Sequence, residues 1–224
     1  MVIALEAKPT QTNVVSQNDR LGEQRLPVLE EVLEEIADQN DRFDPTVLTL
    51  DNPEPPSLED FLANPLKRVE WINGQLVEQT GMTAKTGRIQ AKLARHLGNY
   101  QESSGQGGEV YVETSCRTTG RVRCPDVAYL DAAQVAEQGD FKVLPHSFPF
   151  VAEIISPNDG AEEVFQKVRE YLESQAQEVW LVFPDSGWVL TITATAQALV
   201  QGDDAVSTHA VLPGFSIPVA DLLA

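Results

Sequence analysis

The order of elements along this chain predicts an α/β fold with a mixed central sheet. A long helical pattern is followed by three strand-like runs, a second helix and at least two further strands. The chain has 224 residues, 42% of them hydrophobic, which is enough to bury a core. No apolar run reaches the roughly 18 residues that a membrane-spanning helix needs. Because the N-terminus also lacks the pattern of a secretory signal, we expect a cytoplasmic protein with no membrane partner.

Residues 1–56 are predicted to form an acidic arm. The first 60 residues hold 14 acidic and 4 basic side chains, and the segment is rich in Gln, Asn, Asp and Pro. Leu29, Leu33 and Ile36 recur at helical spacing, which indicates one amphipathic helix over residues 26–37. The arm is either a solvated segment or one that docks on a partner subunit through this narrow apolar stripe.

A globular domain is predicted over residues 57–224. Ser57, three residues before Asp60, is placed to cap a short helix that runs to about residue 62. Residues 69–78 then indicate a β-hairpin, because Asn73-Gly74 is the strongest two-residue signal for a type I′ turn and strand-forming residues flank it.

The first long helix is predicted over residues 84–100, where apolar side chains recur at helical spacing. A second stripe of the same helix is basic. Its four members fall within about 80° of each other around the helix axis: Lys85, Arg88, Lys92 and Arg95. The net charge of −18 argues against a general affinity for nucleic acid. The stripe is therefore either a solvated face or a local surface that supplies most of any affinity for a phosphate backbone.

Strand-like runs follow at residues 110–115, 122–130 and 148–156, then a helix at 160–174 and strands at 178–183 and 188–195. Glu153 interrupts the apolar run 148–156, which has the pattern of a strand covered on both faces. An unpaired ionised carboxylate there is costly, so Glu153 must be neutralised, paired with a cation or bound to a metal ion.

Asp126 is the second carboxylate of interest. It follows Pro125 at the start of the apolar run 127–130. Two carboxylates on neighbouring strands make a hard oxygen site suited to Mg²⁺ or Mn²⁺. In the alternative interpretation, Asp126 accepts hydrogen bonds in a turn and Glu153 pairs with Arg121 or Arg123.

Lys167 lies at the margin of the second helix, about 40° beyond Tyr171 and therefore beside the buried arc. From there it can lean toward the sheet. An ammonium group near a metal–carboxylate centre positions water or stabilises charge on a phosphate group. An ordinary lysine at a helix boundary has the same spacing.

Several motifs occur in order over residues 57–224. They are Glu70-Trp-Ile-Asn-Gly-Gln-Leu, Pro125-Asp126, Glu153-Ile-Ile-Ser-Pro, Lys167 four residues before Tyr171, Glu178-Val-Trp-Leu-Val and Leu212-Pro-Gly-Phe. Together they resemble a large family of restriction-endonuclease-like proteins within the PD-(D/E)XK nuclease superfamily.

This resemblance implies a restriction-endonuclease-like mixed central sheet flanked by helices. It also implies that Asp126 and Glu153 bind a divalent metal ion and that Glu70 is an additional acidic member of the site. The superfamily motif usually has its lysine two residues after the acid, where this chain has Ile155. The resemblance therefore assigns the role to Lys167, on the following helix. Thr86 is a further departure, at a position where relatives often carry histidine.

Two functions from different classes follow. The first is a Mg²⁺- or Mn²⁺-dependent DNA endonuclease, in which Asp126 and Glu153 hold the metal ion that drives phosphodiester hydrolysis and Lys167 assists. The second is a catalytically silent, nuclease-derived binding or assembly module. It is motivated by the net charge of −18, by the displaced lysine and by Thr86.

A homodimer is also predicted. The strands at 178–183 and 188–195 are strongly apolar and are expected near a sheet edge, which invites pairing with another chain. A two-fold axis also places identical centres on the two strands of a duplex. Alternatively, the C-terminal segment 211–223 or the acidic arm covers this edge.

Overall fold

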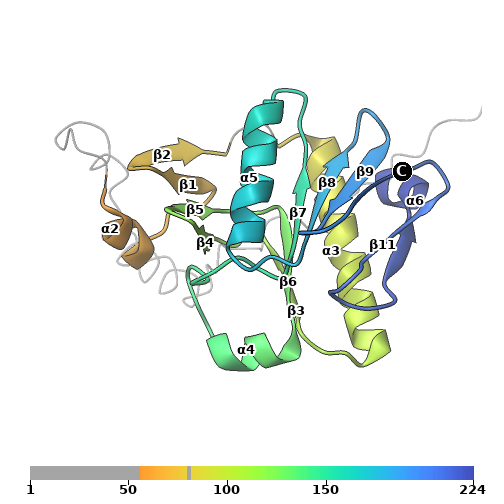
Figure 1. Ribbon diagram of the computed structural model, residues 1–224, viewed down its shortest axis with the longest axis horizontal. Helices are drawn as coiled ribbons and strands as arrows, with labels where there is room; N and C mark the ends of the chain where they lie inside the picture. Colours follow the sequence, from red (N-terminus) through yellow and green to blue (C-terminus); the bar gives the residue numbers. More distant parts are fainter. Residues whose placement is uncertain (1–55, 80–81) are drawn as a thin grey trace, which may run out of the picture. The chain divides into compact units, whose positions relative to one another are not determined.

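A six-stranded mixed sheet lies at the centre of this protein, for which a computed structural model describes residues 56–79 and 82–224 (Figure 1). The strand order is β10–β9–β8–β7–β6–β3, and only β7 and β8 run parallel. The strands are β3 Glu109–Val112, β6 Val127–Leu130, β7 Phe150–Ile154, β8 Glu178–Phe183, β9 Trp188–Ile192 and β10 Gln197–Gln201. The predicted α/β fold with a mixed central sheet is confirmed.

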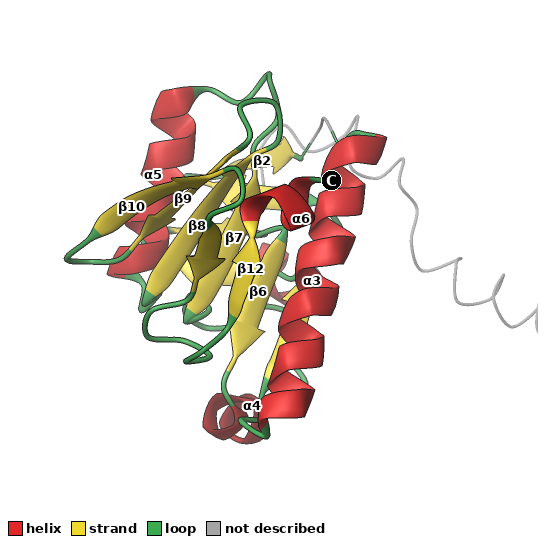
Figure 2. Ribbon diagram, turned by 90° about the vertical axis from the view of Figure 1, so that its right-hand side faces the viewer, coloured by secondary structure: helices red, strands yellow, loops and turns green. Residues whose placement is uncertain are grey.

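Helices cover both faces of this sheet, with α3 Ala84–Ser104 on one and α5 Ala161–Glu173 on the other (Figure 2). Each helix lies within a turn of its predicted bounds, although α3 continues past residue 100 and ends at Gly105, whose φ of 71° is left-handed. Apolar side chains of α3 pack in one core cluster, and those of α5 pack in a second cluster on the opposite face.

A second sheet carries the predicted hairpin. Its order is β2–β1–β5–β4, from β1 Val69–Ile72, β2 Gln75–Glu78, β4 Cys116–Thr118 and β5 Arg121–Arg123. Asn73 and Gly74 have φ values of 49° and 84°, both positive as a type I′ turn requires. Ser57 caps α2 Leu58–Ala63 by accepting a hydrogen bond from the Asp60 amide, as predicted.

The predicted strand over 122–130 is wrong, because β5 and β6 belong to different sheets. Cys124, Pro125 and Asp126 separate them, and Pro125 has no amide hydrogen with which to continue a ladder. The sequence reasoning also missed β4, β10 and several smaller elements: α4 Ala132–Gln138, β11 Ala205–Ser207, β12 Ser216–Pro218 and α6 Val219–Leu223.

The strands at 178–183 and 188–195 lie near a sheet edge, as expected, but they do not form it, since β8 and β9 each have two neighbours and β10 is the outer strand on this side. Residues 1–55, including the helix expected over 26–37 and the arm's docking role, lie outside the described residues. None of the described helices has the length and apolar character needed to cross a membrane.

Candidate active site

Asp126 and Glu153 lie opposite each other on antiparallel strands. The register pairs Val127 with Ala152, so Asp126, which immediately precedes β6, comes opposite Glu153 of β7 when this register is extended by one residue. Side chains alternate along a strand, and on both strands the neighbouring positions of the same parity pack in the α5 cluster. Both carboxylates therefore lie on the face of the sheet that α5 covers. The predicted proximity of these two residues is a feature of the fold.

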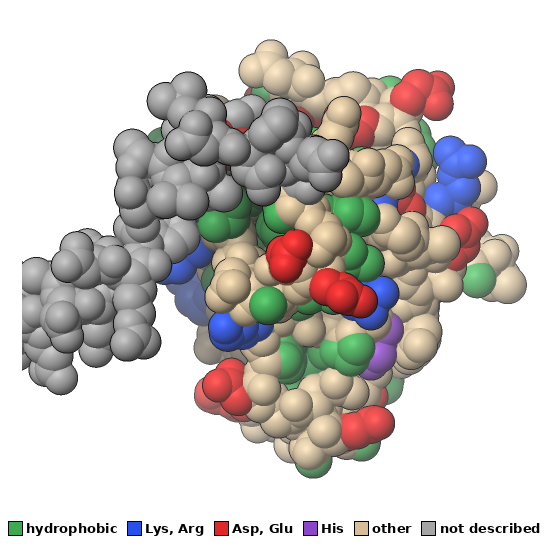
Figure 3. Space-filling model, turned by 90° about the vertical axis from the view of Figure 1, so that its left-hand side faces the viewer, with side chains coloured by type: hydrophobic (Ala, Val, Ile, Leu, Met, Phe, Trp, Pro, Cys, Tyr) green, Lys and Arg blue, Asp and Glu red, His purple; other side chains and the backbone are tan. Residues whose placement is uncertain are grey.

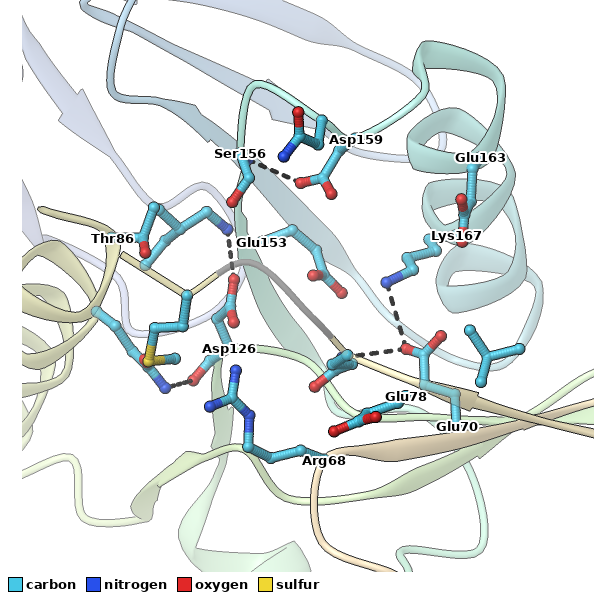
Figure 4. Close-up of a pocket in the computed structure, with 16 residues that line it drawn as sticks. Arg68, Glu70, Glu78, Thr86, Asp126, Glu153, Ser156, Asp159, Glu163 and Lys167 are labelled. Carbon is cyan, nitrogen blue, oxygen red and sulfur yellow. Dashed lines mark hydrogen bonds and ion pairs between the residues drawn. The ribbon is translucent and has the colours of Figure 1, made fainter. Parts of the chain in front are cut away.

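Specific donors hold each carboxylate in position (Figure 4). The Ile154 amide donates to Oδ2 of Asp126 at 2.7 Å, and the Tyr171 hydroxyl donates to Oε1 of Glu153 at 2.6 Å. Nε2 of Gln90, on α3, donates to the backbone carbonyl of Asp126 at 3.0 Å. Helices from both faces of the sheet thus fix the positions of the two carboxylates.

Within the described residues, no lysine or arginine lies at ion-pair distance from either carboxylate. The alternative prediction that Glu153 pairs with Arg121 or Arg123 is wrong, because both arginines bind Glu170 and Arg123 also binds Glu70. The two arginines are two residues apart on β5, in the other sheet, so their side chains lie on the same face of that strand. Both side chains reach Glu170 on α5 rather than Glu153 on β7. Glu153 is 7% exposed, and no lysine or arginine of residues 56–79 and 82–224 forms an ion pair with it.

Burial raises the pKa of Asp126 to about 6 and that of Glu153 to about 7. The charge of Lys167 opposes this rise at both residues, and the mutual repulsion of the two carboxylates adds to it at Glu153. The ionised pair is therefore costly in the absence of another cation.

Lys167 reaches the same site from α5. Its ammonium lies 3.3 Å from Oε1 of Glu70, and its side chain is 17% exposed. Burial alone would lower the pKa of Lys167, but Glu153 and Glu70 together raise it above its ordinary value. Lys167 is therefore a charged group beside the two carboxylates, as its position at the helix margin predicts.

Glu70 is tied into a buried network. Its Oε2 accepts from Arg123 at 2.7 Å, and its Oε1 accepts from the Cys124 amide and from Nε2 of Gln79, each at 3.3 Å. Arg123 also donates to both oxygens of Glu170, at 2.7 and 3.1 Å, and Arg121 donates to Glu170 as well. Both oxygens of Glu70 are already occupied by donors.

Sequence reasoning missed Glu170, Arg68 and Gln90 as members of this region. It also treated Tyr171 only as a core residue. The sequence contained a signal for two of these four residues, namely helical spacing. Glu170 and Tyr171 lie three and four residues after Lys167, which is the spacing of side chains on one helix face.

A pocket of about 270 Å³ opens over the two carboxylates. Its charged lining consists of six carboxylates and two cations: Glu70, Glu78, Asp126, Glu153, Asp159, Glu163, Arg68 and Lys167. The described residues contain no group of three or more His, Cys, Asp or Glu arranged to hold a metal ion. Mg²⁺ commonly binds through one or two carboxylates and keeps several water ligands, so Asp126 and Glu153 suit a divalent ion of this kind.

The predicted basic stripe of α3 is not uniform. Lys85 pairs with Asp185 at 2.7 Å, and Lys92 donates to the backbone carbonyls of Asp221 and Ala224. Arg88 and Arg95 are exposed. None of the four lines the pocket, whereas Thr86 does, and Thr86 also forms the capping box of α3 with Thr83.

Comparison with known proteins agrees with this architecture. The family model Uma2, described as "Putative restriction endonuclease", matches residues 55–220. A solved structure titled as a "putative nuclease belonging to DUF820" from Anabaena variabilis has a TM-score of 0.67 and 19% identity, covering 75% of this chain and 98% of that one. At this identity the likeness is one of fold. Among proteins of curated function, none matches. Because the family model spans most of the sequence, this chain belongs to the Uma2 family, described as "Putative restriction endonuclease".

Proposed function

We propose that this protein is a DNA endonuclease that hydrolyses phosphodiester bonds with a divalent metal ion, Mg²⁺ or Mn²⁺, held by Asp126 and Glu153. One observation carries the proposal: the buried Glu153 and the half-buried Asp126 lie opposite each other at a pocket, and no lysine or arginine among the described residues forms an ion pair with either. A pair of ionised carboxylates in such a place is stabilised by a bound cation. Membership of a restriction-endonuclease family supports the choice of reaction.

A bound divalent ion supplies an activated water molecule and stabilises negative charge on the phosphate. The residues of the chain prepare the site for it. The Ile154 amide and the Tyr171 hydroxyl fix one oxygen of each carboxylate and leave the other oxygen without a hydrogen-bond donor among the described residues. Ligands held in this way need little reorganisation when the ion binds.

Lys167 is proposed to assist the reaction from α5. Its ammonium stays charged between Glu70 and Glu153, so it can stabilise negative charge or hold a water molecule by hydrogen bonding. Glu70 is proposed as a positioning residue, because donors from Arg123, Cys124, Gln79 and Lys167 already engage its oxygens.

The silent binding module remains the competing proposal. It was motivated by the net charge of −18, by the absence of lysine at position 155 and by the presence of Thr86. An ammonium group lines the pocket nevertheless, at Lys167, and Thr86 caps a helix instead of leaving the pocket wall unsupported. These two features favour the enzyme.

The test is cleavage of plasmid and oligonucleotide DNA in Mg²⁺, Mn²⁺ and EDTA. Asp126→Asn and Glu153→Gln preserve side-chain shape and should each lower the rate roughly hundredfold or more, as removal of one stabilising group commonly does. Glu162→Gln removes an exposed carboxylate of α5 that does not line the pocket and is the matched control. If the two site variants cleave as fast as the parent, the activity belongs to a contaminant and the proposal fails.

Metal binding separates the two candidate functions without any need for turnover. Calorimetry should detect Mn²⁺ binding in the parent and in Glu162→Gln, and little or none in Glu153→Gln. Equal Mn²⁺ affinity in Glu153→Gln and the parent would favour the silent module.

A further inference from the structure

Arg68 is the second cation of the pocket, and it enters from the hairpin rather than from α5. It stands immediately before β1, and its carbonyl accepts a hydrogen bond from the Gln79 amide at 2.8 Å, which closes the open end of the hairpin. In Figure 4, Arg68 extends from this strand toward Asp126, while Lys167 approaches Glu153 from α5.

Unlike the other cations of this region, the side chain of Arg68 has no ion-pair or hydrogen-bond partner in the described part of the chain. Arg121 and Arg123 are bound by Glu170, and Lys167 lies against Glu70. Arg68 forms no ion pair there, and its Nε is enclosed by the protein without any hydrogen-bond acceptor. An enclosed donor without an acceptor costs about 1–3 kcal/mol. The guanidinium of Arg68 is therefore held in the pocket wall without compensation from the rest of the described chain.

The backbone conformation at Arg68 also suggests a ligand-binding position. Its φ of 57° lies in the left-handed region, which costs a residue with a Cβ roughly 1–2 kcal/mol. The flanking structure holds it there, since Glu70 is fixed by Arg123 and Trp71 donates to the carbonyl of Pro56 at 2.8 Å. Strain of this kind often occurs at ligand-binding positions.

We propose that Arg68 binds a phosphate group of the substrate strand at the pocket, on the hairpin side of Asp126 and Glu153. This assignment rests on the proposed nuclease function and names the residue that holds the substrate there. A guanidinium presents a planar fork of donors that matches two phosphate oxygens, which a lysine does not. Arg68 has its charge and its two terminal guanidinium nitrogens available for such a ligand, because no hydrogen bond or ion pair engages them in the described part of the chain.

The charges that line the pocket explain why a phosphate group needs a cation there. Six carboxylates line the pocket, so a phosphate meets repulsion unless a cation contacts it directly. On the face seen in Figure 3, basic side chains lie scattered among acidic ones and form no broad basic surface in the described part. Lys85 and Lys92 are already occupied elsewhere. Lys167 is held by Glu70, so Arg68 is the pocket cation without an ion pair in the described part of the chain, and we expect it to contribute to the placement of a phosphate at the pocket.

Binding of a fluorescently labelled DNA oligonucleotide, followed by anisotropy in EDTA, tests the assignment. The background is the double variant Asp126→Asn/Glu153→Gln. It removes two of the six negative charges that repel DNA at the pocket and prevents cleavage, and it keeps acceptors for the Ile154 amide and the Tyr171 hydroxyl. Arg68→Gly is the principal variant, because glycine adopts a positive φ without strain and the fold should be retained. Lys67→Ala is the matched control, since Lys67 is the exposed cation next in the chain and does not line the pocket.

Arg68→Gly should raise the Kd roughly tenfold, the effect of one lost charge-assisted hydrogen-bonding group. It should also lower the slope of log K against log salt by about 1. Lys67→Ala should change the Kd by less than about twofold. Arg68→Lys, which keeps the charge and loses the fork, should weaken binding several-fold and serves if the glycine variant does not fold.

An unchanged Kd and salt slope in Arg68→Gly, or in Arg68→Lys where that variant is needed, overturns the assignment. The result also separates this inference from the function on which it rests. If the active parent cleaves DNA and the Arg68 variant cleaves with the same kcat/KM, only the role of Arg68 is wrong. If the active parent neither binds nor cleaves DNA, the proposed function is wrong and this assignment falls with it.

Discussion

The ammonium of Lys167 lies 3.3 Å from Oε1 of Glu70, so the cation that α5 brings to the pocket is held by the first strand of the hairpin. Glu70 is itself held by Arg123, and Arg123 by Glu170, one turn of α5 beyond Lys167. The helix and the hairpin are thus joined through a chain of buried charges. Removing one member of such a network leaves another charge buried without its partner, which is strongly destabilising.

The metal-free protein is expected to lose stability as the pH rises. For Glu153 the pKa rises from 4.5 in the unfolded chain to about 7 in the folded one, and for Asp126 from 3.8 to about 6. Between these values the unfolded state binds fewer protons, so the free energy of unfolding falls with increasing pH. The free energy of unfolding of Glu153→Gln, taken relative to that of the parent, should therefore increase by on the order of 2 kcal/mol between about pH 5 and about pH 8.

Urea unfolding of the parent and Glu153→Gln in EDTA at the two pH values measures this difference. Glu162→Gln is the control, because it removes an exposed carboxylate of α5 that does not line the pocket. A difference between Glu153→Gln and the parent that stays constant with pH would show that Glu153 ionises as freely in the folded protein as in the unfolded chain.

Glu70→Gln should separate positioning from metal binding. The change removes the negative charge that holds Lys167 while keeping the size of the side chain, so kcat should fall roughly tenfold. Because donors already occupy both Glu70 oxygens, the affinity for Mn²⁺ should change less than about threefold, far less than in Glu153→Gln. Kinetics and calorimetry on the same preparations measure both. Equal loss of Mn²⁺ affinity in Glu70→Gln and Glu153→Gln would make Glu70 a metal ligand.

Arg88 and Arg95 are expected to carry the DNA affinity of the basic stripe. Both are exposed, whereas Lys85 and Lys92 are engaged by other groups of the protein. Arg88→Glu/Arg95→Glu should therefore weaken oligonucleotide binding with little dependence on sequence and reduce its salt dependence. Lys92→Met should instead lower the free energy of unfolding by about 1 kcal/mol, since two hydrogen bonds to carbonyls near the C-terminus are lost. Parental salt dependence in the double variant rejects the stripe as a contact surface.

A homodimer is expected to form through β10. This outer strand has the sequence Gln-Ala-Leu-Val-Gln, without charge or proline, and its Leu199 is 53% exposed. Such an edge invites pairing with a second copy, and an added lysine should block it. Light scattering at micromolar concentration should give twice the chain mass for the parent and for Ser103→Lys on α3, but about 24.6 kDa for Leu199→Lys. A parent mass of 24.6 kDa, together with the mass of a single shortened chain when residues 1–56 are removed, eliminates both the dimer and any role of the arm in it.

Local patterns were sufficient for much of this fold. Asn73-Gly74 predicted the hairpin because only a few residue pairs adopt two positive φ values, and that preference belongs to the residues themselves. The periodicity of α3 and α5 predicted both helices for the same reason. Glu153 was identified because a charge within an apolar strand is anomalous along the sequence, before any partner is known.

Partner choice was decided only in the tertiary structure. The sequence left open whether Arg121 or Arg123 pairs with Glu153, and the binding of Arg123 to Glu70 and Glu170 depends on how the second sheet meets α5. The outer position of β10 and the unpartnered state of Arg68 were likewise outside the reach of local patterns. The sequence by itself determined which side chains are costly to bury, since that cost is a property of each residue and its neighbours. Which cation pairs with each carboxylate, and which carboxylates have no such partner among the described residues, depends on distances between residues far apart in the chain, and only the packed structure sets those distances.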